Sequence, residues 1–269
     1  MGGEEADLKE RLLTQEERER YSRQMLLADV GEVGQKKLLA AKVLIVGAGG
    51  LASPAAMYLA ASGVGEIGVV DDDVVDLSNL QRQIAHRSAD VGRKKADSMA
   101  MALAALNPAV RVNVYRERLS EDNAEAILCD RSYDFVLDCT DNFPAKFLIN
   151  DACVRLHKPF SHAGITGFGG QIMTVVPQEG PCYRCIFEDV PEDGTVPTSR
   201  EIGILGAAAG VMGSLQAVEA VKYILGIGDL LVGRLLIYDA LTMKFREVEL
   251  LKRNASCAVC NEEVMAQEF

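Results

Sequence analysis

The stretch Val43-Leu44-Ile45-Val46-Gly47-Ala48-Gly49-Gly50-Leu51-Ala52 decides the fold of this protein. It begins with four apolar residues, three of them β-branched, which predict a short buried strand, and the small residues after the glycines predict a helix. A strand, a glycine turn and a helix N-terminus aim backbone N–H groups at a phosphate. The spacing Gly47-x-Gly49-x-x-Ala52 matches the G-x-G-x-x-A dinucleotide-binding fingerprint. A tight turn without a ligand would show the same pattern, so other residues must identify the ligand.

Strand-like and helix-like runs alternate beyond this stretch. Strands are expected over 42–46, 65–70, 110–115, 133–137 and 159–162, and helices over 51–62, 92–106, 121–128 and 144–156. This alternation predicts an α/β fold with a doubly wound, mainly parallel, Rossmann-like sheet, which binds ligands at the carboxyl ends of its strands. Beyond Gly164, strands over 170–176, 235–238 and 245–250 and an apolar helix over 207–225 indicate an antiparallel C-terminal extension.

Three regions are expected within one compact domain. Residues 1–30 would form an N-terminal helical arm, in which the capping box Thr14-x-x-Glu17 begins a helix over 15–28. Residues 31–165 would form the Rossmann-like, nucleotide-binding region, and residues 166–269 the C-terminal extension.

The charge balance argues against two classes of partner. Lys plus Arg number 28 and Asp plus Glu 39, a net charge of −11. Nucleic acid and anionic membranes both require a basic surface, so neither is expected as a partner. The longest apolar run, 202–215, contains glycines and is too short to span a bilayer, which takes about 20 residues. The N-terminus shows no signal-peptide pattern, and we expect a cytoplasmic protein.

Polar residues follow several of the expected strands. Asp71 and Asp73 follow the second strand, and Asp71 lies where an acidic residue reads a ribose hydroxyl in dinucleotide-binding folds. The segment 78–82 and the pair Asp141-Asn142 also follow carboxyl ends of strands. Because the carboxyl ends of parallel strands meet at one edge, these groups should converge there with the glycine turn. A solvated acidic turn remains the alternative interpretation of Asp71.

Four of the seven cysteines form two C-x-x-C pairs, Cys182/Cys185 and Cys257/Cys260. Each pair places two thiolates on one tight turn, and two such turns make a tetrahedral four-thiolate zinc site. With no open coordination position, that zinc would be structural. Four free or redox-active cysteines are the alternative. The remaining three, expected to be buried as small apolar side chains, are Cys129, Cys139 and Cys153.

A combination of motifs resembles one known family. The motifs are Arg20-Tyr21-Ser22-Arg23-Gln24, Val46-Gly47-Ala48-Gly49-Gly50-Leu51, Leu77-Ser78-Asn79-Leu80-Gln81-Arg82-Gln83, Asp138-Cys139-Thr140-Asp141-Asn142, Pro181-Cys182-Tyr183-Arg184-Cys185, Gly213-Ser214-Leu215-Gln216-Ala217 and the second C-x-x-C pair. Together they resemble the bacterial MoeB/ThiF/HesA adenylyltransferases, which activate ubiquitin-like sulfur carriers and are related to ubiquitin-activating enzymes. The resemblance covers about 13–260.

The resemblance implies a reaction. ATP and Mg²⁺ would bind at the sheet edge, and the carboxylate of a Gly-Gly tail on a small ubiquitin-like sulfur carrier would attack the α-phosphate. Pyrophosphate would leave and an acyl-adenylate would remain. The C-terminal extension would hold zinc and dock the carrier. The residues do not distinguish a molybdopterin-pathway carrier from a thiamine-pathway carrier.

The resemblance also assigns roles to residues. Arg82 and Lys95 would hold the phosphates, Asp141 would bind Mg²⁺, and an arginine at the place of Arg23 would reach across a homodimer interface to the partner's phosphates. These are the expected catalytic residues. The nucleotide would be bound by Gly47, Gly49, Gly50, Asp71, Asp73, Ser78, Asn79, Arg82, Lys95, Asp141 and Asn142.

This chain departs from many of the family's members in one respect. They carry a cysteine in the polar loop after the first C-x-x-C pair, whereas no cysteine lies between Cys185 and Cys257 here, and Ser199 is the approximate counterpart. We therefore expect adenylation without a covalent enzyme intermediate through that loop, and a separate sulfur donor. A smaller departure is Ala52, where a glycine is common.

Three other functions compete with this interpretation. The glycine turn and Asp71 alone would suit an NAD-dependent oxidoreductase, which leaves the segment 77–83 and Asp141 unexplained. A non-catalytic subunit of an activating enzyme would have lost a phosphate-binding arginine or the magnesium aspartate. A relative that adenylates a small carboxylate or a modified tRNA base is the third, and the negative charge disfavours tRNA.

Overall fold

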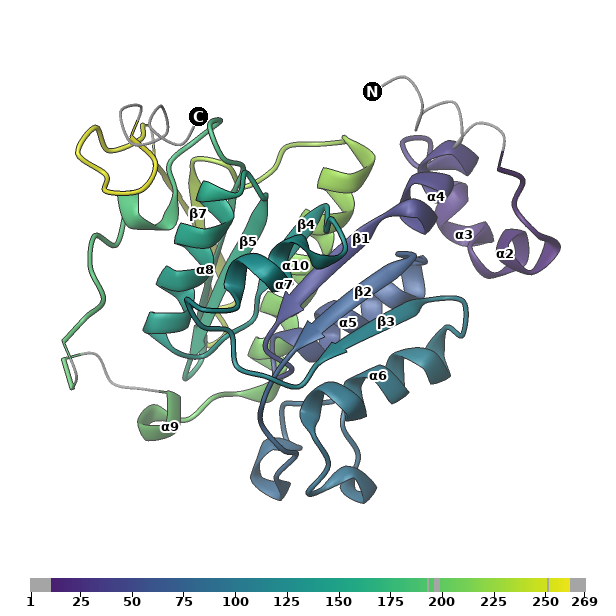
Figure 1. The fold of residues 1–269 in the computed structure, drawn as a ribbon, viewed down its shortest axis with the longest axis horizontal. Coiled ribbons are helices and arrows are strands. Elements are labelled where there is room, and N and C mark those ends of the chain that lie inside the picture. Colours follow the sequence, from purple (N-terminus) through teal and green to yellow (C-terminus); the bar gives the residue numbers. More distant parts are fainter. Residues whose placement is uncertain (1–10, 193, 196–198, 251, 262–269) are drawn as a thin grey trace.

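Eight strands form one continuous sheet in the computed structural model, which describes residues 11–192, 194–195, 199–250 and 252–261. The order across the sheet is β3-β2-β1-β4-β5-β6-β7-β8. The first five strands run parallel to their neighbours and the pairs β5–β6, β6–β7 and β7–β8 are antiparallel. The predicted fold class, with its antiparallel extension, is confirmed (Figure 1). The strands are β1 (Lys42–Val46), β2 (Glu66–Val70), β3 (Arg111–Tyr115), β4 (Phe135–Asp138), β5 (Phe160–Thr166), β6 (Gly169–Val175), β7 (Arg234–Asp239) and β8 (Lys244–Glu249).

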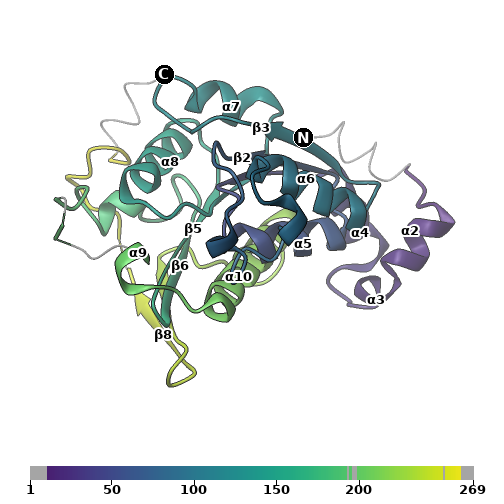
Figure 2. The same ribbon diagram turned by 90° about the horizontal axis from the view of Figure 1, so that it is seen from below.

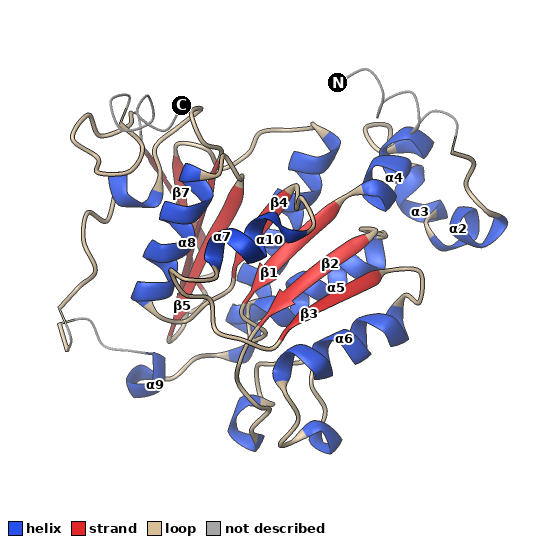
Figure 3. Cartoon of the chain, viewed as in Figure 1, coloured by secondary structure: helices blue, strands red, loops and turns tan. Residues whose placement is uncertain are grey.

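Helices connect the parallel strands, as the alternating pattern predicts (Figure 3). None of the helices within the described ranges combines the length and the apolar character that crossing a membrane requires. The helices are α2 (Gln15–Arg20), α3 (Ser22–Met25), α4 (Gly31–Ala40), α5 (Ala52–Ser62), α6 (Lys95–Leu106), α7 (Ala124–Asp130), α8 (Phe143–Arg155), α9 (Ser199–Ile202) and α10 (Gly206–Leu225), with short 3₁₀ turns η1 (Leu77–Asn79), η2 (Ser88–Asp90) and η3 (Tyr183–Cys185).

The N-terminal arm differs from its prediction. The expected helix over 15–28 is two short helices, because Tyr21 leaves helical geometry between α2 and α3. The Tyr21 side chain is buried and its hydroxyl accepts a hydrogen bond from Asn107 Nδ2 (2.9 Å). A third helix, α4, was not predicted. It leads directly into β1, so α2, α3 and α4 lie beyond the amino end of that strand (Figure 1).

Alternate residues of β1 face two different cores. Val43 and Ile45 pack in one core with side chains of α5, α6 and α10, whereas Leu44 and Val46 pack in another with α7 and α8. Figure 2 shows α7 and α8 on one side of the sheet and α5 and α10 on the other. Both faces of the parallel strands are thus covered, which explains why those strands are continuously apolar.

The order in which successive strands are added to the sheet reverses at β1. From β1 the chain proceeds to β2 and β3 on one side, and then returns to β4 on the other side of β1. A crevice opens where such a switch occurs, at the carboxyl ends of the two central strands, and open α/β sheets bind their ligands there. The loops that follow β1 and β4 therefore border the expected site.

Glycine at position 213 allows α10 to contact α5 closely. A Cβ atom there would lie 2.1 Å from Leu51 O and 2.7 Å from Pro54 Cγ. We expect Gly213→Ala to lower the free energy of unfolding by about 1–3 kcal/mol, because backbone must move to admit the methyl group. Urea unfolding of the variant measures this loss.

The same helix supplies a matched control for this prediction. A Cβ at Gly210 would meet no atom of the described residues within 4 Å. Gly210→Ala should therefore raise the free energy of unfolding by up to about 1 kcal/mol, through helix propensity alone. Equal stability of the Gly213→Ala and Gly210→Ala variants would contradict the close contact between α10 and α5.

Candidate active site and metal centre

The glycine turn after β1 is held by backbone hydrogen bonds and by the neighbouring loop. Gly47 has a φ of +94°, and a Cβ on it would lie 2.8 Å from Cys139 O, so only glycine fits. Ala48 N donates to Asp71 Oδ2 (2.7 Å), and Ala48 O contacts His86 Nε2 (2.9 Å). His86 is buried and its other ring nitrogen contacts Ser98 Oγ (2.9 Å). Sequence reasoning missed His86, which fixes the carbonyl of the glycine turn.

Asp71 lies at the end of β2 with its carboxylate oriented by backbone donors. Its Oδ2 accepts from Ala48 N, and its Oδ1 accepts from Asp73 N (2.8 Å). Burial raises the pKa of Asp71, while the bond from Ala48 and the charge of Lys95 oppose the rise. Each oxygen retains a lone pair, so the carboxylate can still accept a hydrogen bond from a hydroxyl group of a ligand.

Lys95 and Asp73 form an ion pair beside that carboxylate. Lys95 Nζ lies 2.8 Å from Asp73 Oδ2, and Lys95 N donates to Asp73 O (2.9 Å). The lysine side chain is 9% exposed, whereas that of Asp73 is 64% exposed. In this structure Asp73 therefore orients the ammonium of Lys95, the first residue of α6.

Arg82 packs against the glycine turn. Its Cγ would lie 3.3 Å from a Cβ on Gly50, and its guanidinium donates to Ser78 O (3.3 Å) and to Asn79 Oδ1 (3.5 Å). Asn79 Oδ1 also accepts from Gln83 Nε2 (3.0 Å). The structure thus brings Gly50, Ser78, Asn79 and Arg82 together, as the sequence predicts.

Gln83 was not predicted as a site residue. It is buried, and a Cβ on Gly49 would lie 3.6 Å from its Nε2. Its Oε1 is one of two buried side-chain polar atoms that lack a hydrogen-bond partner within the described part of the chain. The sequence signal that could have identified Gln83 is its position at the end of the motif 77–83, which carries the family resemblance.

The loop between β4 and α8 carries Asp141 and Asn142. Asn142 caps α8 by accepting from Ala145 N (3.0 Å), and the side chain of Asp141 is exposed. Cys139 N donates to Val46 O (2.9 Å), which joins this loop to the end of β1. The loop therefore lies beside the glycine turn, at the carboxyl ends of β1 and β4.

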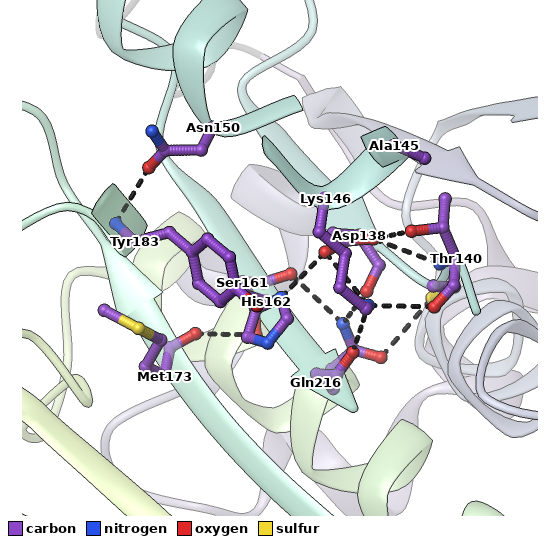
Figure 4. A network of polar contacts seen from close by, with 12 residues as sticks. Asp138, Thr140, Ala145, Lys146, Asn150, Ser161, His162, Met173, Tyr183 and Gln216 are labelled. Carbon is purple, nitrogen blue, oxygen red and sulfur yellow. Dashed lines mark hydrogen bonds and ion pairs between the residues drawn. The ribbon is translucent and has the colours of Figure 1, made fainter. Parts of the chain in front are cut away.

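A buried polar network lies behind this loop (Figure 4). The Asp138 carboxylate contacts His162 Nδ1 (2.8 Å) and Lys146 Nζ (3.3 Å), and it accepts from Thr140 Oγ1 (2.6 Å). Gln216 Nε2 donates to Asp138 O (2.9 Å) and thereby connects α10 to β4. Burial alone would raise the pKa of Asp138, but Lys146, His162 and Thr140 lower it well below its ordinary value, so the group is ionised.

Sequence reasoning did not assign these network residues to the site. Asp138 and Gln216 stood in quoted motifs, but the spacing of Lys146 and His162 shows no periodic pattern with either. Burial and the charge of Lys146 lower the pKa of His162. The ring is therefore neutral with its proton on Nδ1, since the carboxylate can only accept.

Arg23 lies far from the crevice of its own chain. The neighbouring Gln24 donates from Nε2 to Ser62 O (2.8 Å), at the carboxyl end of α5. That end of α5 leads to the amino end of β2, and Figure 1 shows α3 at the opposite end of the sheet from the glycine turn. Within one chain the structure does not bring Arg23 to the other predicted residues.

The two C-x-x-C pairs meet in one cluster. The four sulfur atoms lie within 4.8 Å of one another, with distances of 4.0 Å for Cys182–Cys185, 3.7 Å for Cys182–Cys257 and 3.3 Å for Cys185–Cys260. Tetrahedral zinc with Zn–S bonds of about 2.3 Å requires sulfur atoms about 3.8 Å apart. The cluster therefore fits zinc. Asn254 N also donates to Cys185 Sγ (3.3 Å), as outer donors do in thiolate sites.

Helix α8 holds the first cysteine turn. Asn150 Oδ1 accepts from Tyr183 N (2.8 Å), and Asp151 binds the guanidinium of Arg184 with both oxygens (2.7 and 2.8 Å). The helix that begins at the Asp141 loop thus also positions the cysteine cluster.

The three other cysteines do not all match their prediction. Cys139 and Cys153 are buried, as expected, and burial raises the pKa of both thiols. Cys129 is exposed, so that part of the prediction is wrong. It occupies an outward position near the end of α7, where the apolar neighbours Ile127 and Leu128 face the core.

Comparison with known proteins extends over nearly the whole chain. Residues 21–259 match the model of the ThiF family. The chain is 48% identical to the Thermus thermophilus sulfur carrier protein adenylyltransferase, over 95% of each chain. It is also 48% identical to the Haloferax volcanii SAMP-activating enzyme E1, over 91% of this chain and 89% of that one. Identity to the mouse adenylyltransferase and sulfurtransferase MOCS3 is 45%, over 93% of this chain and 54% of that protein.

Solved structures show the same fold. The crystal structure of E. coli MccB with MccA-N7isoASN has a TM-score of 0.78 at 25% identity and covers 91% of this chain and 75% of that chain. The structure of PaaA has a TM-score of 0.72 at 27% identity, over 89% and 75% of the two chains. Because a family model that spans 21–259 and relatives 48% identical over most of their length agree, the chain belongs to the ThiF family.

Proposed function

We propose that this protein adenylates the C-terminal Gly-Gly carboxylate of a small ubiquitin-like sulfur carrier with ATP and Mg²⁺, releasing pyrophosphate. One observation supports the proposal: in a ThiF-family chain the glycine turn contacts Arg82, the Asp71 segment that pairs with Lys95, and the loop that leads to Asp141. The relatives that match at 48% identity are named as a sulfur carrier protein adenylyltransferase and a SAMP-activating E1.

The residue types suit attack at a phosphate. The carboxylate and the triphosphate are both anions, so fixed cations and backbone donors favour their approach and the charge that develops. Arg82 and Lys95 would supply the cations, and Asp71 would accept from a ribose hydroxyl. The N–H groups of Gly49 and Gly50 would supply donors, because those of Gly47 and Ala48 already donate to Val70 O and Asp71 Oδ2. Mg²⁺ binds through one or two carboxylates together with substrate phosphates, and the exposed carboxylate of Asp141 fits that role. The step requires no side-chain nucleophile.

We also infer a homodimer in which each chain supplies Arg23 to its partner's site. Arg23 is exposed, and α3, the helix that carries it, lies at the opposite end of the sheet from the glycine turn (Figure 1). The adjacent Leu26 and Leu27 are 76% and 59% exposed, and Val33 is 68% exposed. These apolar side chains form a surface that a second copy would cover. The four-cysteine cluster would hold one structural zinc per chain.

ATP–pyrophosphate exchange tests the proposed function. We expect exchange when ATP, Mg²⁺ and a Gly-Gly-tailed sulfur carrier are present, and none when the carrier lacks its last glycine, because no carboxylate then reaches the α-phosphate. Molybdopterin-pathway and thiamine-pathway carriers should be compared side by side. Exchange that proceeds without a carrier would contradict the proposal, and binding of NAD in preference to MgATP would favour an oxidoreductase.

The same incubation tests for a covalent intermediate. No cysteine lies between Cys185 and Cys257, so we expect acyl-adenylate to accumulate without a thiol-sensitive carrier–enzyme adduct. Sulfur would then come from a separate donor protein. A carrier–enzyme band that thiols remove would contradict this expectation.

A further inference from the structure

The two residues on either side of Asp141, Thr140 and Asn142, are both held by hydrogen bonds. Thr140 N donates to Asp138 Oδ1 (3.0 Å), and Thr140 O accepts from Lys146 Nζ (2.8 Å). On the other side, Asn142 caps α8 through Ala145 N. The exposed Asp141 side chain therefore projects from between two residues held by hydrogen bonds. The position of its carboxylate depends on those bonds.

Lys146 supplies the charged donor among these anchors. It lies one turn into α8, and its ammonium is buried, with 8% of the side chain exposed. The three donors of the ammonium have three acceptors: Thr140 O, Ala163 O at 2.7 Å and Asp138 Oδ2 at 3.3 Å. Figure 4 shows this ammonium between Asp138 and Thr140. Because Thr140 O belongs to the peptide that joins Thr140 to Asp141, Lys146 fixes the orientation in which Asp141 leaves the chain.

The positive charge of Lys146 is balanced by the carboxylate of Asp138. Asp138 is fully buried and ionised, and His162 beside it is neutral. A buried ion pair of this kind gives little net stability compared with apolar side chains of similar size, because both charges lose their hydration. Its specific effect is geometric: the Lys146 ammonium holds the Thr140 carbonyl in one orientation in the loop after β4.

We propose that Lys146 is a positioning residue, whose ammonium fixes the Thr140–Asp141 peptide so that Asp141 presents its carboxylate to Mg²⁺ on the bound nucleotide. This inference rests on the proposed function, in which Asp141 is the magnesium carboxylate. Groups that orient a metal ligand typically change metal affinity by about 10–100-fold when they are removed. Lys146 acts through Asp141, because its ammonium is buried and its three donors are directed at protein acceptors.

Calorimetric binding of ATP, in Mg²⁺ and in EDTA, tests this role. For the wild-type chain Mg²⁺ should raise the affinity for ATP. In Lys146→Met that gain should shrink by about 10–100-fold, while affinity in EDTA stays at the wild-type value. Lys146→Arg retains the charge and several donors and should restore most of the gain. Lys158→Met is the matched control, because Lys158 Nζ also donates to a backbone carbonyl, Tyr133 O at 3.0 Å, away from the Asp141 loop.

Two further variants separate positioning from folding. Lys146→Met alone leaves Asp138 without its cation, so Asp138→Asn/Lys146→Met removes both charges and avoids an unpaired buried carboxylate. The double variant should fold, as judged by its urea midpoint, and should still lose the increase in ATP affinity that Mg²⁺ causes in the wild type. In an Asp141→Ala background, Lys146→Met should have no further effect on that gain, because the two residues act through one carboxylate.

The outcomes distinguish this inference from the proposed function. The positioning role would be overturned if the folded double variant showed the same Mg²⁺-dependent increase in ATP affinity as the wild type. It would also be overturned if Lys146→Met reduced that increase further in the Asp141→Ala background, to the full extent seen in the wild-type background. Equal ATP affinity of the wild-type chain in Mg²⁺ and in EDTA would overturn it too. The binding measurement needs no carrier, so absence of carrier-dependent exchange would count against the proposed function only.

Discussion

Arg82→Ala should reduce carrier-dependent ATP–pyrophosphate exchange by about 10²–10³-fold, and Asp141→Ala by a similar factor. The stem of Arg82 packs on Gly50, and its guanidinium contacts neutral acceptors, Ser78 O and Asn79 Oδ1, at 3.3 and 3.5 Å. Its charge is therefore available to the phosphates that would lie on the glycine turn. Initial rates of exchange at saturating carrier measure the loss.

Arg116→Ala is the matched control for Arg82→Ala. Arg116 also follows the carboxyl end of a parallel strand, β3, but it already binds both oxygens of Asp97 (3.0 and 2.9 Å). Removing it should leave exchange unchanged. Unfolding curves should show that the Arg82 and Asp141 variants remain folded. If exchange survived in both of those variants, the assignment of the site would be wrong.

Removal of zinc should have the largest effect on the structure. Structural zinc in small modules contributes about 10–16 kcal/mol of apparent binding free energy, which is comparable to the whole stability of a typical domain. The cluster joins the turn at Cys182 to the segment around Cys257, and α8 holds that turn through Asn150 and Asp151. We expect Cys257→Ser to lose the metal, to unfold at a lower temperature and to become sensitive to protease near 252–261.

Metal analysis and thermal unfolding check this expectation. The wild-type chain should contain about one zinc, and a strong chelator should reproduce the effect of Cys257→Ser. Cys129→Ser provides the control, because that cysteine is exposed and lies outside the cluster. A Cys257→Ser variant that kept both its zinc and its melting temperature would show that the cluster does not bind the metal as proposed.

The elements predicted most accurately were those with strong local signals. The apolar run before Gly47 forms β1, and Pro108 follows the end of α6, as a helix-stopping residue should. Helix α4 was missed because its pattern is weak: it contains two glycines, and the buried Gln35 is polar. Gln35 Nε2 donates to Ser62 O (3.1 Å), a contact across the fold that satisfies the side chain.

The sequence by itself determined the features that depend on near neighbours. Two C-x-x-C turns, a glycine turn between a strand and a helix, and an aspartate after a strand are each encoded within a few residues, because backbone sterics and the strand and helix periods act locally. Family resemblance then connected them into one reaction.

Only the tertiary structure decided which distant groups meet. Lys146, His162 and Gln216 come from different elements, and they converge on Asp138 only because β4 lies beside β5 and under α10. The same packing placed α3, which carries Arg23, at the opposite end of the sheet from the glycine turn. It also brought Ala209 of α10 against Gly50 of that turn. Burial supplies the physical reason: a buried charge must find partners wherever the fold places them, and no sequence spacing records that choice.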